Sequence, residues 1–128
     1  MGWNCMPTNV INFDDVRIPK SYLIGEEGKG FNIAMAGLDG GRINIASCSL
    51  GGAWFALEKT AEYMGERQVF GKALQNLDYL TFKYSEMLAE FISSREMVRH
   101  AAKAFDDENA ETKTLAAIAK LLATPRCS

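Results

Sequence analysis

A run of apolar and small residues between positions 77 and 105 constrains the fold of this chain more than any other feature. Its members are separated by alternating steps of three and four residues, which places them on one face of an α-helix. Such a face packs against neighbouring helices in a bundle. The pattern therefore predicts a long helix at the centre of a mainly helical fold. The members of this apolar run are Leu77, Leu80, Tyr84, Met87, Phe91, Ser94, Val98, Ala101 and Phe105.

The segment before this run predicts two helices separated by a break. Glycine costs roughly 1 kcal/mol relative to alanine inside a helix, so Gly40 and Gly41 should interrupt the helical pattern, and Asp39 can cap a new start. We expect a short helix that ends at about residue 38 and a long one from about 40 to 66. The small residues between 46 and 53 would allow another helix to approach the long helix closely.

A third helix is predicted after the central one. The acidic stretch 106–108 should end the central helix, Asn109 can cap the next, and that helix should stop at Thr124, before Pro125. Three helices in up-down-up order leave an apolar surface for a fourth, and a second copy of the chain is the most economical source. We therefore expect self-association into a dimer or tetramer. The apolar stripe of the third helix is expected at Leu115, Ile118 and Leu122.

The N-terminal part has a different character. Residues 3–25 contain Pro7, Pro19, the β-branched pair 10–11 and the acidic turn 14–15, which predicts two short extended segments. This part is too short to form a sheet alone. The predicted fold class is thus mainly α, an up-down helical bundle preceded by a short β segment.

Composition excludes several functions. With 128 residues, 48% of them hydrophobic, the chain can bury the core of one domain. A net charge of -2 without a basic cluster argues against a nucleic-acid partner. Cys5, Cys48 and Cys127 form no CxxC pair and His100 stands alone, so we expect no metal site, no disulfide framework and a reducing compartment. No apolar run approaches a membrane span of roughly 18 residues, and residues 1–4 show no targeting segment, which predicts a soluble chain.

Three strings, in order and at matching intervals, resemble the acyl-CoA dehydrogenase family. Residues 10–31 resemble the end of its middle β-domain and the beginning of its C-terminal helical domain. Residues 37–51 (GLDGGRINIASCSLG) are similar to the start of the long helix in the isobutyryl-CoA branch, and residues 67–71 resemble an Arg-x-x-Phe-Gly turn. The resemblance covers residues 3–124. It implies that 1–27 are a remnant of the middle β-domain and that 28–128 are a truncated C-terminal helical bundle domain.

The resemblance implies an FAD-dependent oxidoreductase that removes hydrogens from Cα and Cβ of a short branched acyl-CoA. FAD accepts the hydride in this reaction, and a glutamate takes the α-proton. Because that proton is a very weak acid, the base, the flavin and donors to the thioester carbonyl must be held together. Membership of this family also implies a part in fatty-acid or branched-chain amino-acid catabolism. A eukaryotic parent would act in the mitochondrial matrix, and any other parent in the cytoplasm.

The resemblance assigns a substrate-binding role to the segment Asp39, Gly40, Gly41 and Arg42. In the family this segment lines the acyl-CoA pocket, and an arginine at a helix start can hold a negative group. From the residues alone, the favoured interpretation is that Asp39 is an N-cap and Arg42 a solvated side chain.

A second set, Arg67, Phe70, Leu77 and Asp78, corresponds to the family's contacts with the FAD of a neighbouring subunit. A guanidinium suits a pyrophosphate, and Phe70 would pack beside it. From the residues alone, Arg67 also suits a helix C-terminus. Leu77 and Asp78 depart from the polar residue and glutamine common in relatives, and a carboxylate repels a pyrophosphate. Binding of FAD to this chain is therefore expected to be weak or absent.

The sequence supplies no candidate for the catalytic base. In most members the glutamate lies in a loop beyond residue 128, and in two branches it directly precedes the arginine, where this chain has Gly41. The ending 125–128 also departs from the family, as a splice variant, a frameshift or an artificial boundary would. Two hypotheses follow: an enzyme fragment that is inactive alone, or a non-catalytic helical module that binds itself or a full-length relative.

Overall fold

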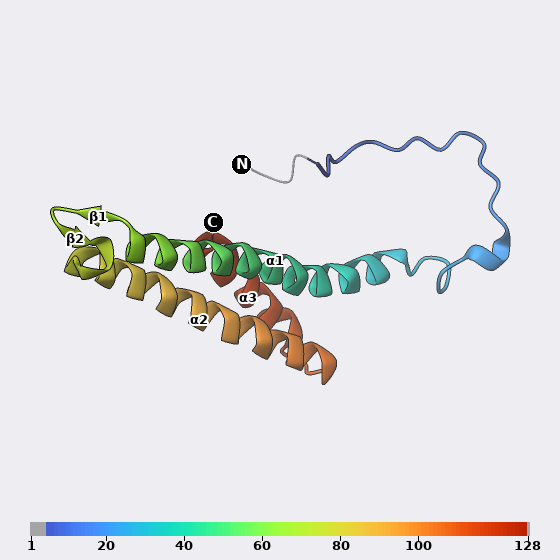
Figure 1. Ribbon diagram of the computed structural model, residues 1–128. Coiled ribbons are helices and arrows are strands. Elements are labelled where there is room, and N and C mark those ends of the chain that lie inside the picture. Colours follow the sequence, from blue (N-terminus) through green and yellow to red (C-terminus); the bar gives the residue numbers. More distant parts are fainter. Residues whose placement is uncertain (1–4, 128) are drawn as a thin grey trace. The chain divides into compact units, whose positions relative to one another are not determined.

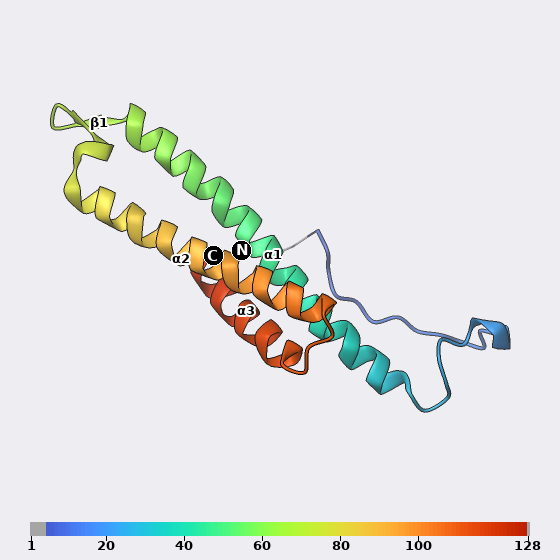
Figure 2. The ribbon, with the colours of Figure 1, turned by 90° about the horizontal axis from the view of Figure 1, so that it is seen from below.

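The computed structural model describes residues 5–127, and α-helices make up most of it (Figure 1). Helix α1 spans Gly30–Glu66, α2 spans Asp78–Asp106 and α3 spans Thr112–Arg126. α1 and α2 run antiparallel, and α3 folds back along α2 (Figure 2). The predicted mainly helical fold with up-down-up order is therefore confirmed. The expectation about a targeting segment at residues 1–4 lies outside the described residues.

The chain divides into two units, residues 1–31 and residues 32–128. Within the described part of the first unit, the regular element before α1 is a 3₁₀-helix at Lys20–Tyr22, where the Tyr22 amide donates to the Pro19 carbonyl at 2.9 Å. Among residues 5–25, the described part of the stretch where extended segments are expected, no strands form. An extended segment needs neighbouring strands for its backbone hydrogen bonds, and residues 5–29 have none among themselves.

The strands lie instead between α1 and α2. β1 (Gln68–Val69) and β2 (Lys72–Ala73) form an antiparallel hairpin in which Gln68 is opposite Ala73 and Val69 is opposite Lys72. A 3₁₀-helix at Leu74–Asn76 then leads into α2.

Helix α1 is continuous, so the break predicted at Gly40 and Gly41 is wrong. Asp39 does not cap a new helix; within the α1 turn its Oδ1 accepts a hydrogen bond from Nη1 of Arg42 at 2.5 Å. Packing explains why the glycines are tolerated, because helices in proteins gain most of their stability from burying an apolar face. The α1 side chains that are buried for this purpose are Ile43, Ala46, Leu50, Leu57 and Met64.

The centre of the predicted apolar run on α2 is confirmed as its buried face. Phe91, Ser94, Val98 and Ala101 are buried, together with Ala104. The ends of the run are less enclosed, since Met87 is 38% exposed and Phe105 is 43% exposed. The pattern therefore identifies the packed middle of α2 and overestimates its length.

The buried stripe of α3 differs from the predicted one. Ala116, Ala119 and Ala123 are fully buried, whereas Leu115 and Leu122 are half-buried and Ile118 is 38% exposed. Small side chains let the backbones of two helices approach closely, and larger residues are then displaced to the edge of the contact. The small residues that make this close contact lie on α2 and α3 rather than in the run 46–53 of α1.

The boundaries of α3 also differ from expectation. The helix starts at Thr112, after Glu111, while the Asn109 side chain accepts the Glu111 amide at 2.8 Å in the preceding turn. Its last turn includes Pro125, and the Cys127 amide donates to the Ala123 carbonyl at 3.1 Å. Among the described residues, no helix combines the length and the apolar character needed to cross a bilayer.

One polar atom in the core has no partner. Ser94 is fully buried on α2, and its Oγ makes no hydrogen bond with any described atom. An unsatisfied buried hydroxyl costs about 1–3 kcal/mol. Ser94 therefore favours the contact between helices because its side chain is small, and not because it makes a polar interaction.

Replacing Ser94 by alanine should stabilise the chain by about 1 kcal/mol, because it removes the unpaired hydroxyl and keeps the small side chain. The matched control is Ser93→Ala, since the exposed Ser93 hydroxyl donates to the Glu90 carbonyl at 2.9 Å. That control gains only the difference in helix propensity, a few tenths of a kcal/mol. Urea unfolding followed by circular dichroism measures both variants, and equal effects would contradict this account of Ser94.

Candidate functional site

The residues predicted to bind substrate lie on one turn of α1. Asp39 is only 8% exposed, and it pairs with Arg42, whose side chain remains 43% exposed. A buried carboxylate requires such a partner, because removing it from water is costly otherwise. Gly41 is exposed, and a Cβ at Gly40 would lie 3.7 Å from Cζ of Phe105. The arrangement presents one guanidinium, oriented by a carboxylate, at the surface of α1.

A cavity of about 550 Å³ lies beside Asp39, between α1 and the turn that joins α2 to α3. This volume falls in the range of small-molecule sites, roughly 300–1,000 Å³. The sequence assigns Phe105 to an apolar run and Asn109 to a helix cap. It does not place them beside Asp39, because they lie about 70 positions away in the sequence. The polar and aromatic residues that line the cavity are Asp39, Phe105, Glu108, Asn109, Thr112 and Lys113.

The residues predicted to bind cofactor lie together in the connection between α1 and α2. Arg67 and Leu74 bracket the hairpin through a backbone hydrogen bond of 2.9 Å from the Leu74 amide to the Arg67 carbonyl. Leu77 is half-buried immediately before α2, and Asp78 is the exposed first residue of that helix. The Arg67 side chain is exposed and makes no ion pair with a described residue.

The hairpin turn holds Phe70 in an unusual conformation. Phe70 has φ 54° and Gly71 has φ 74°, as a type I′ turn requires at both central positions. Asparagine and glycine suit this geometry, whereas a bulky side chain at positive φ is strained. Phe70 is also 92% exposed, so its ring gains almost no packing within the chain. This turn therefore presents an aromatic ring to solvent at a cost to stability.

The predicted substrate-binding residues and the predicted cofactor-binding residues lie far apart within one chain. Between Arg42 and Arg67 the helix rises by roughly 37 Å at about 1.5 Å per residue. The structure thus brings the members of each set together and separates the sets from one another. No ligand of ordinary size can contact both sets of the same chain.

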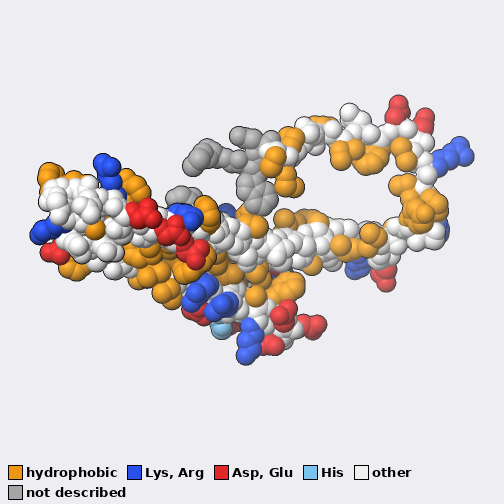
Figure 3. Space-filling model, in the orientation of Figure 1, with side chains coloured by type: hydrophobic (Ala, Val, Ile, Leu, Met, Phe, Trp, Pro, Cys, Tyr) orange, Lys and Arg blue, Asp and Glu red, His pale blue; other side chains and the backbone are white. Residues whose placement is uncertain are grey.

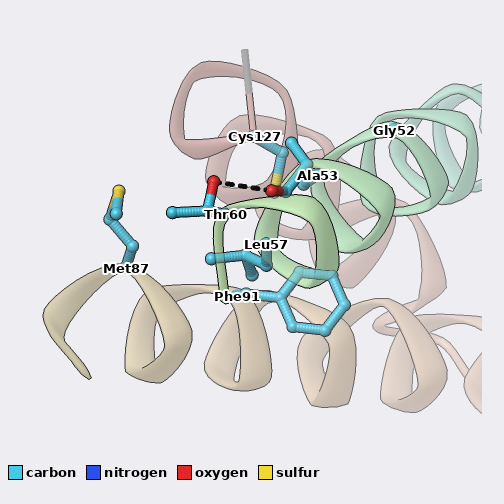
Figure 4. Close-up of a pocket in the computed structure, with 8 residues that line it drawn as sticks. Gly52, Ala53, Leu57, Thr60, Met87, Phe91 and Cys127 are labelled. Carbon is cyan, nitrogen blue, oxygen red and sulfur yellow. Dashed lines mark hydrogen bonds between the residues drawn. The ribbon is translucent and has the colours of Figure 1, made fainter. Parts of the chain in front are cut away.

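A second cavity, of about 220 Å³, lies between α1 and α2 (Figure 4). Leu57 of α1 and Phe91 of α2 line it, and the Thr60 hydroxyl donates to the Ala56 carbonyl at 2.7 Å. Cys127, at the end of α3, also lines the cavity. It contains no carboxylate, imidazole or amine, so its lining suits apolar contact rather than acid-base chemistry.

Large apolar side chains are exposed on the remaining surface of α1 and α2. In the described residues, no three His, Cys, Asp or Glu side chains come together as metal ligands would. Cys48, expected in a packed run of small residues, is exposed. Apolar side chains are spread over the visible face of α1 and α2, with charged groups between them (Figure 3). Large exposed apolar residues of these helices include Leu38, Trp54, Phe55, Tyr63, Tyr79 and Phe82.

Comparisons with known proteins agree on one family. The family model described as "Acyl-CoA dehydrogenase, C-terminal domain" matches residues 28–128. Mitochondrial isobutyryl-CoA dehydrogenase of Bos taurus is 45% identical over 99% of this chain, and that of Dictyostelium discoideum is 41% identical over the same share. Butyryl-CoA dehydrogenase of Megasphaera elsdenii has a similar structure, with a TM-score of 0.86 and 40% identity over 89% of this chain. The chain spans 30% of the length of each of these proteins.

Replacing Phe70 by asparagine should raise the free energy of unfolding by about 1 kcal/mol, because asparagine tolerates the left-handed conformation of this turn. The opposite change is expected for Gly71→Ala, which should destabilise by about 1 kcal/mol, since it introduces a Cβ at φ 74°. Urea unfolding of the two variants beside the unmodified chain measures both effects. A loss of stability in Phe70→Asn would mean that the phenylalanine ring stabilises the folded chain.

Proposed function

The chain belongs to the acyl-CoA dehydrogenase family through the C-terminal domain of that family, and on this premise we propose that it supplies edges of an FAD site and of an acyl-CoA site. The observation that carries the proposal is the hairpin Gln68–Ala73 together with Arg67, which precedes it. It holds an exposed aromatic ring in a strained turn near an exposed guanidinium. The isolated fold gains no packing from this arrangement, whereas a nucleotide cofactor offers a binding partner for both groups.

The proposed reaction is the α,β-dehydrogenation of a short branched acyl-CoA. The identity of 45% with a protein named isobutyryl-CoA dehydrogenase supports this choice. We also assign residues 1–27 to the end of a middle β-domain and 28–128 to the helical domain. A eukaryotic parent would act in the mitochondrial matrix, in keeping with the mitochondrial relatives.

The side chains of the hairpin fit the phosphate-bearing part of FAD. A guanidinium pairs with phosphate oxygens in a fixed, two-pronged geometry, and an exposed ring such as Phe70 can pack on a flat heterocycle. Asp78, exposed at the start of α2, opposes this fit because its carboxylate repels a phosphate. FAD, when bound, supplies the hydride acceptor, and this chain's own groups bind and orient it.

At the other end of α1, the residues fit a role in binding rather than in proton transfer. Arg42 is held by Asp39 and exposes its guanidinium, which can hold a negative group of an acyl-CoA. Gly41, where two branches of the family carry the base, has no side chain to accept a proton. We therefore propose that the chain alone does not catalyse the reaction.

The separation of the two sets supports an assembly of several chains. Because one copy of the chain places Arg42 and Arg67 roughly 37 Å apart, the two edges belong to different active sites. Each site is then completed by another polypeptide. Self-association into a dimer or a tetramer would provide that arrangement.

Replacing Arg67 by alanine should weaken FAD binding by about 1.5 to 3 kcal/mol, the value of a charge-assisted hydrogen bond. Quenching of flavin fluorescence during titration with protein measures the affinity. Arg99→Ala serves as the matched control, since Arg99 is an exposed arginine of α2 that pairs with Glu96 at 3.2 Å. Asp78→Gln should strengthen binding because it removes the repulsion. Unchanged affinity in Arg67→Ala would contradict the proposed cofactor contact.

A second candidate function, a non-catalytic helical module that binds copies of itself or a relative, is favoured by the apolar surface of α1. Trp54 and Phe55 are 44% and 62% exposed in the middle of this helix. Soluble monomers rarely expose apolar patches of more than a few hundred Å². Burial of about 1,000 Å² of such surface would supply roughly 25 kcal/mol before the costs of association.

Replacing Phe55 by aspartate should convert the assembly to monomers, because it places a charge in the proposed interface without altering the core. Phe91→Asp is less informative, because Phe91 is buried within the chain itself and its loss should unfold the helices. Lys103→Asp, at an exposed position of α2, is the control and should leave the assembly intact. Light scattering at micromolar concentration measures the mass, and a well-folded monomer of the unmodified chain would rule out self-association.

A further inference from the structure

A tryptophan and an arginine outside the proposed FAD and acyl-CoA edges contact one buried ring. Phe91 of α2 is only 5% exposed. The ring centroid of Trp54, on α1, lies 5.4 Å from that of Phe91, and Cζ of Arg95 lies 5.8 Å from the Phe91 centroid. Trp54 is nevertheless 44% exposed, and the Arg95 side chain is 38% exposed. Both side chains are therefore held by the core while they remain open to solvent.

The Arg95 guanidinium keeps most of its hydrogen-bonding capacity. Its Nε donates to Oε1 of Glu96 at 3.0 Å, and the same oxygen accepts a hydrogen bond from Nη1 of Arg99 at 3.2 Å. One carboxylate is thus shared by two arginines. Neither Nη nitrogen of Arg95 donates to a described residue. These two groups can bind a carboxylate from another molecule in the two-pronged geometry that suits arginine.

The exposed side of α2 next to Arg95 is cationic. Residues three or four apart share one face of a helix, so Arg99 and Lys103 continue the row that begins at Arg95. Residues 95–103 carry three lysine or arginine charges against one carboxylate, in a chain whose net charge is -2. Ile92, one turn before Arg95, is 41% exposed. Apolar and cationic side chains therefore adjoin on this part of the surface.

We propose that Trp54, Ile92, Arg95, Arg99 and Lys103 form a docking surface for a different protein, through a segment that carries carboxylates beside apolar side chains. Tryptophan and arginine are enriched among the residues that dominate binding energy at protein interfaces. Side chains that are held in place before binding also lose less entropy on association. The partner's carboxylates pair with the row of cations, and its apolar side chains cover Trp54 and Ile92.

The positions of the charges set the orientation of the partner segment. Glu58 is exposed on α1 one turn after Trp54, in the direction of the hairpin, whereas Arg99 lies in the direction of the turn after α2. Because α1 and α2 run antiparallel, these opposite charges lie at opposite ends of the docking surface (Figure 2). The acidic part of the partner segment therefore lies over Arg99, away from Glu58.

This docking surface is distinct from the self-association surface proposed for α1. Phe55 follows Trp54 in the helix and points about 100° away from it around the axis. The aspartate introduced by Phe55→Asp should therefore leave the docking surface intact. Docking of an acidic partner and association of identical chains can be measured separately.

The experiment uses a labelled synthetic peptide with leucines at three-four spacing and glutamates at the other positions, and follows its fluorescence anisotropy during titration with the chain. Arg95→Gln and Arg99→Gln should each weaken binding about five- to tenfold, the lower part of the range for a charge-assisted contact at a partly exposed position. Trp54→Ala should also weaken it. Lys83→Gln is the matched control and should leave the affinity unchanged, since Lys83 is an exposed lysine of α2 that pairs with Glu86 at 3.4 Å.

A second peptide, with lysine in place of every glutamate, should not bind. Equal binding of the two peptides, or unchanged affinity in both arginine variants, would overturn the proposal, because the contact would then not depend on the cationic row. Binding to phosphatidylserine vesicles without binding to the glutamate peptide would assign the surface to a membrane instead. A lower mass of Arg99→Gln in light scattering would assign it to a second copy of the chain. Circular dichroism checks that each variant keeps its helices.

Discussion

The close contact between α2 and α3 is the constraint on which the other features of residues 32–128 depend. Three fully buried alanines of α3 share one core cluster with Phe91, Val98 and Ala101 of α2, and the largest fully buried side chain among the described residues is that of Ser94. Two helices this close exclude larger residues from their contact, so Leu115 and Leu122 lie at its edge. Helix α1 then packs on the pair through longer side chains, among them Ile43 and Leu57.

This packing also explains where the cavities lie. The tight pair brings the turn after α2 close to Asp39 of α1, and an open cavity lies between them. Nearer the hairpin, the space between α1 and α2 remains as the apolar cavity at Leu57 and Phe91, with Cys127 at its wall. Both cavities thus arise from the same helix contacts.

The sequence predicts those features that are set by local periodicity. The middle of α2 follows from its three-four spacing. The Arg67–Gly71 string indicates a turn through its resemblance to the family, but not the two strands that flank it. The sequence misjudges Gly40 and Gly41, because the burial of α1 outweighs a local preference that the two glycines carry alone. It also misses the alanine stripe of α3, since larger apolar residues on the same helix give a stronger signal. The cavity beside Asp39 depends on contacts across about 70 positions, which no local pattern contains.

The continuity of α1 has a consequence for how sequences of this kind can vary in length. In a continuous helix every residue adds a fixed rise and a fixed rotation. The number of residues between Arg42 and the hairpin therefore fixes the orientation of Asp39 and Arg42 relative to the hairpin. Inserting one residue would turn one end by about 100° relative to the other and move it by about 1.5 Å. Insertions and deletions are therefore tolerable in the turns on either side of α2, whereas those within α1 would misdirect one end of the helix.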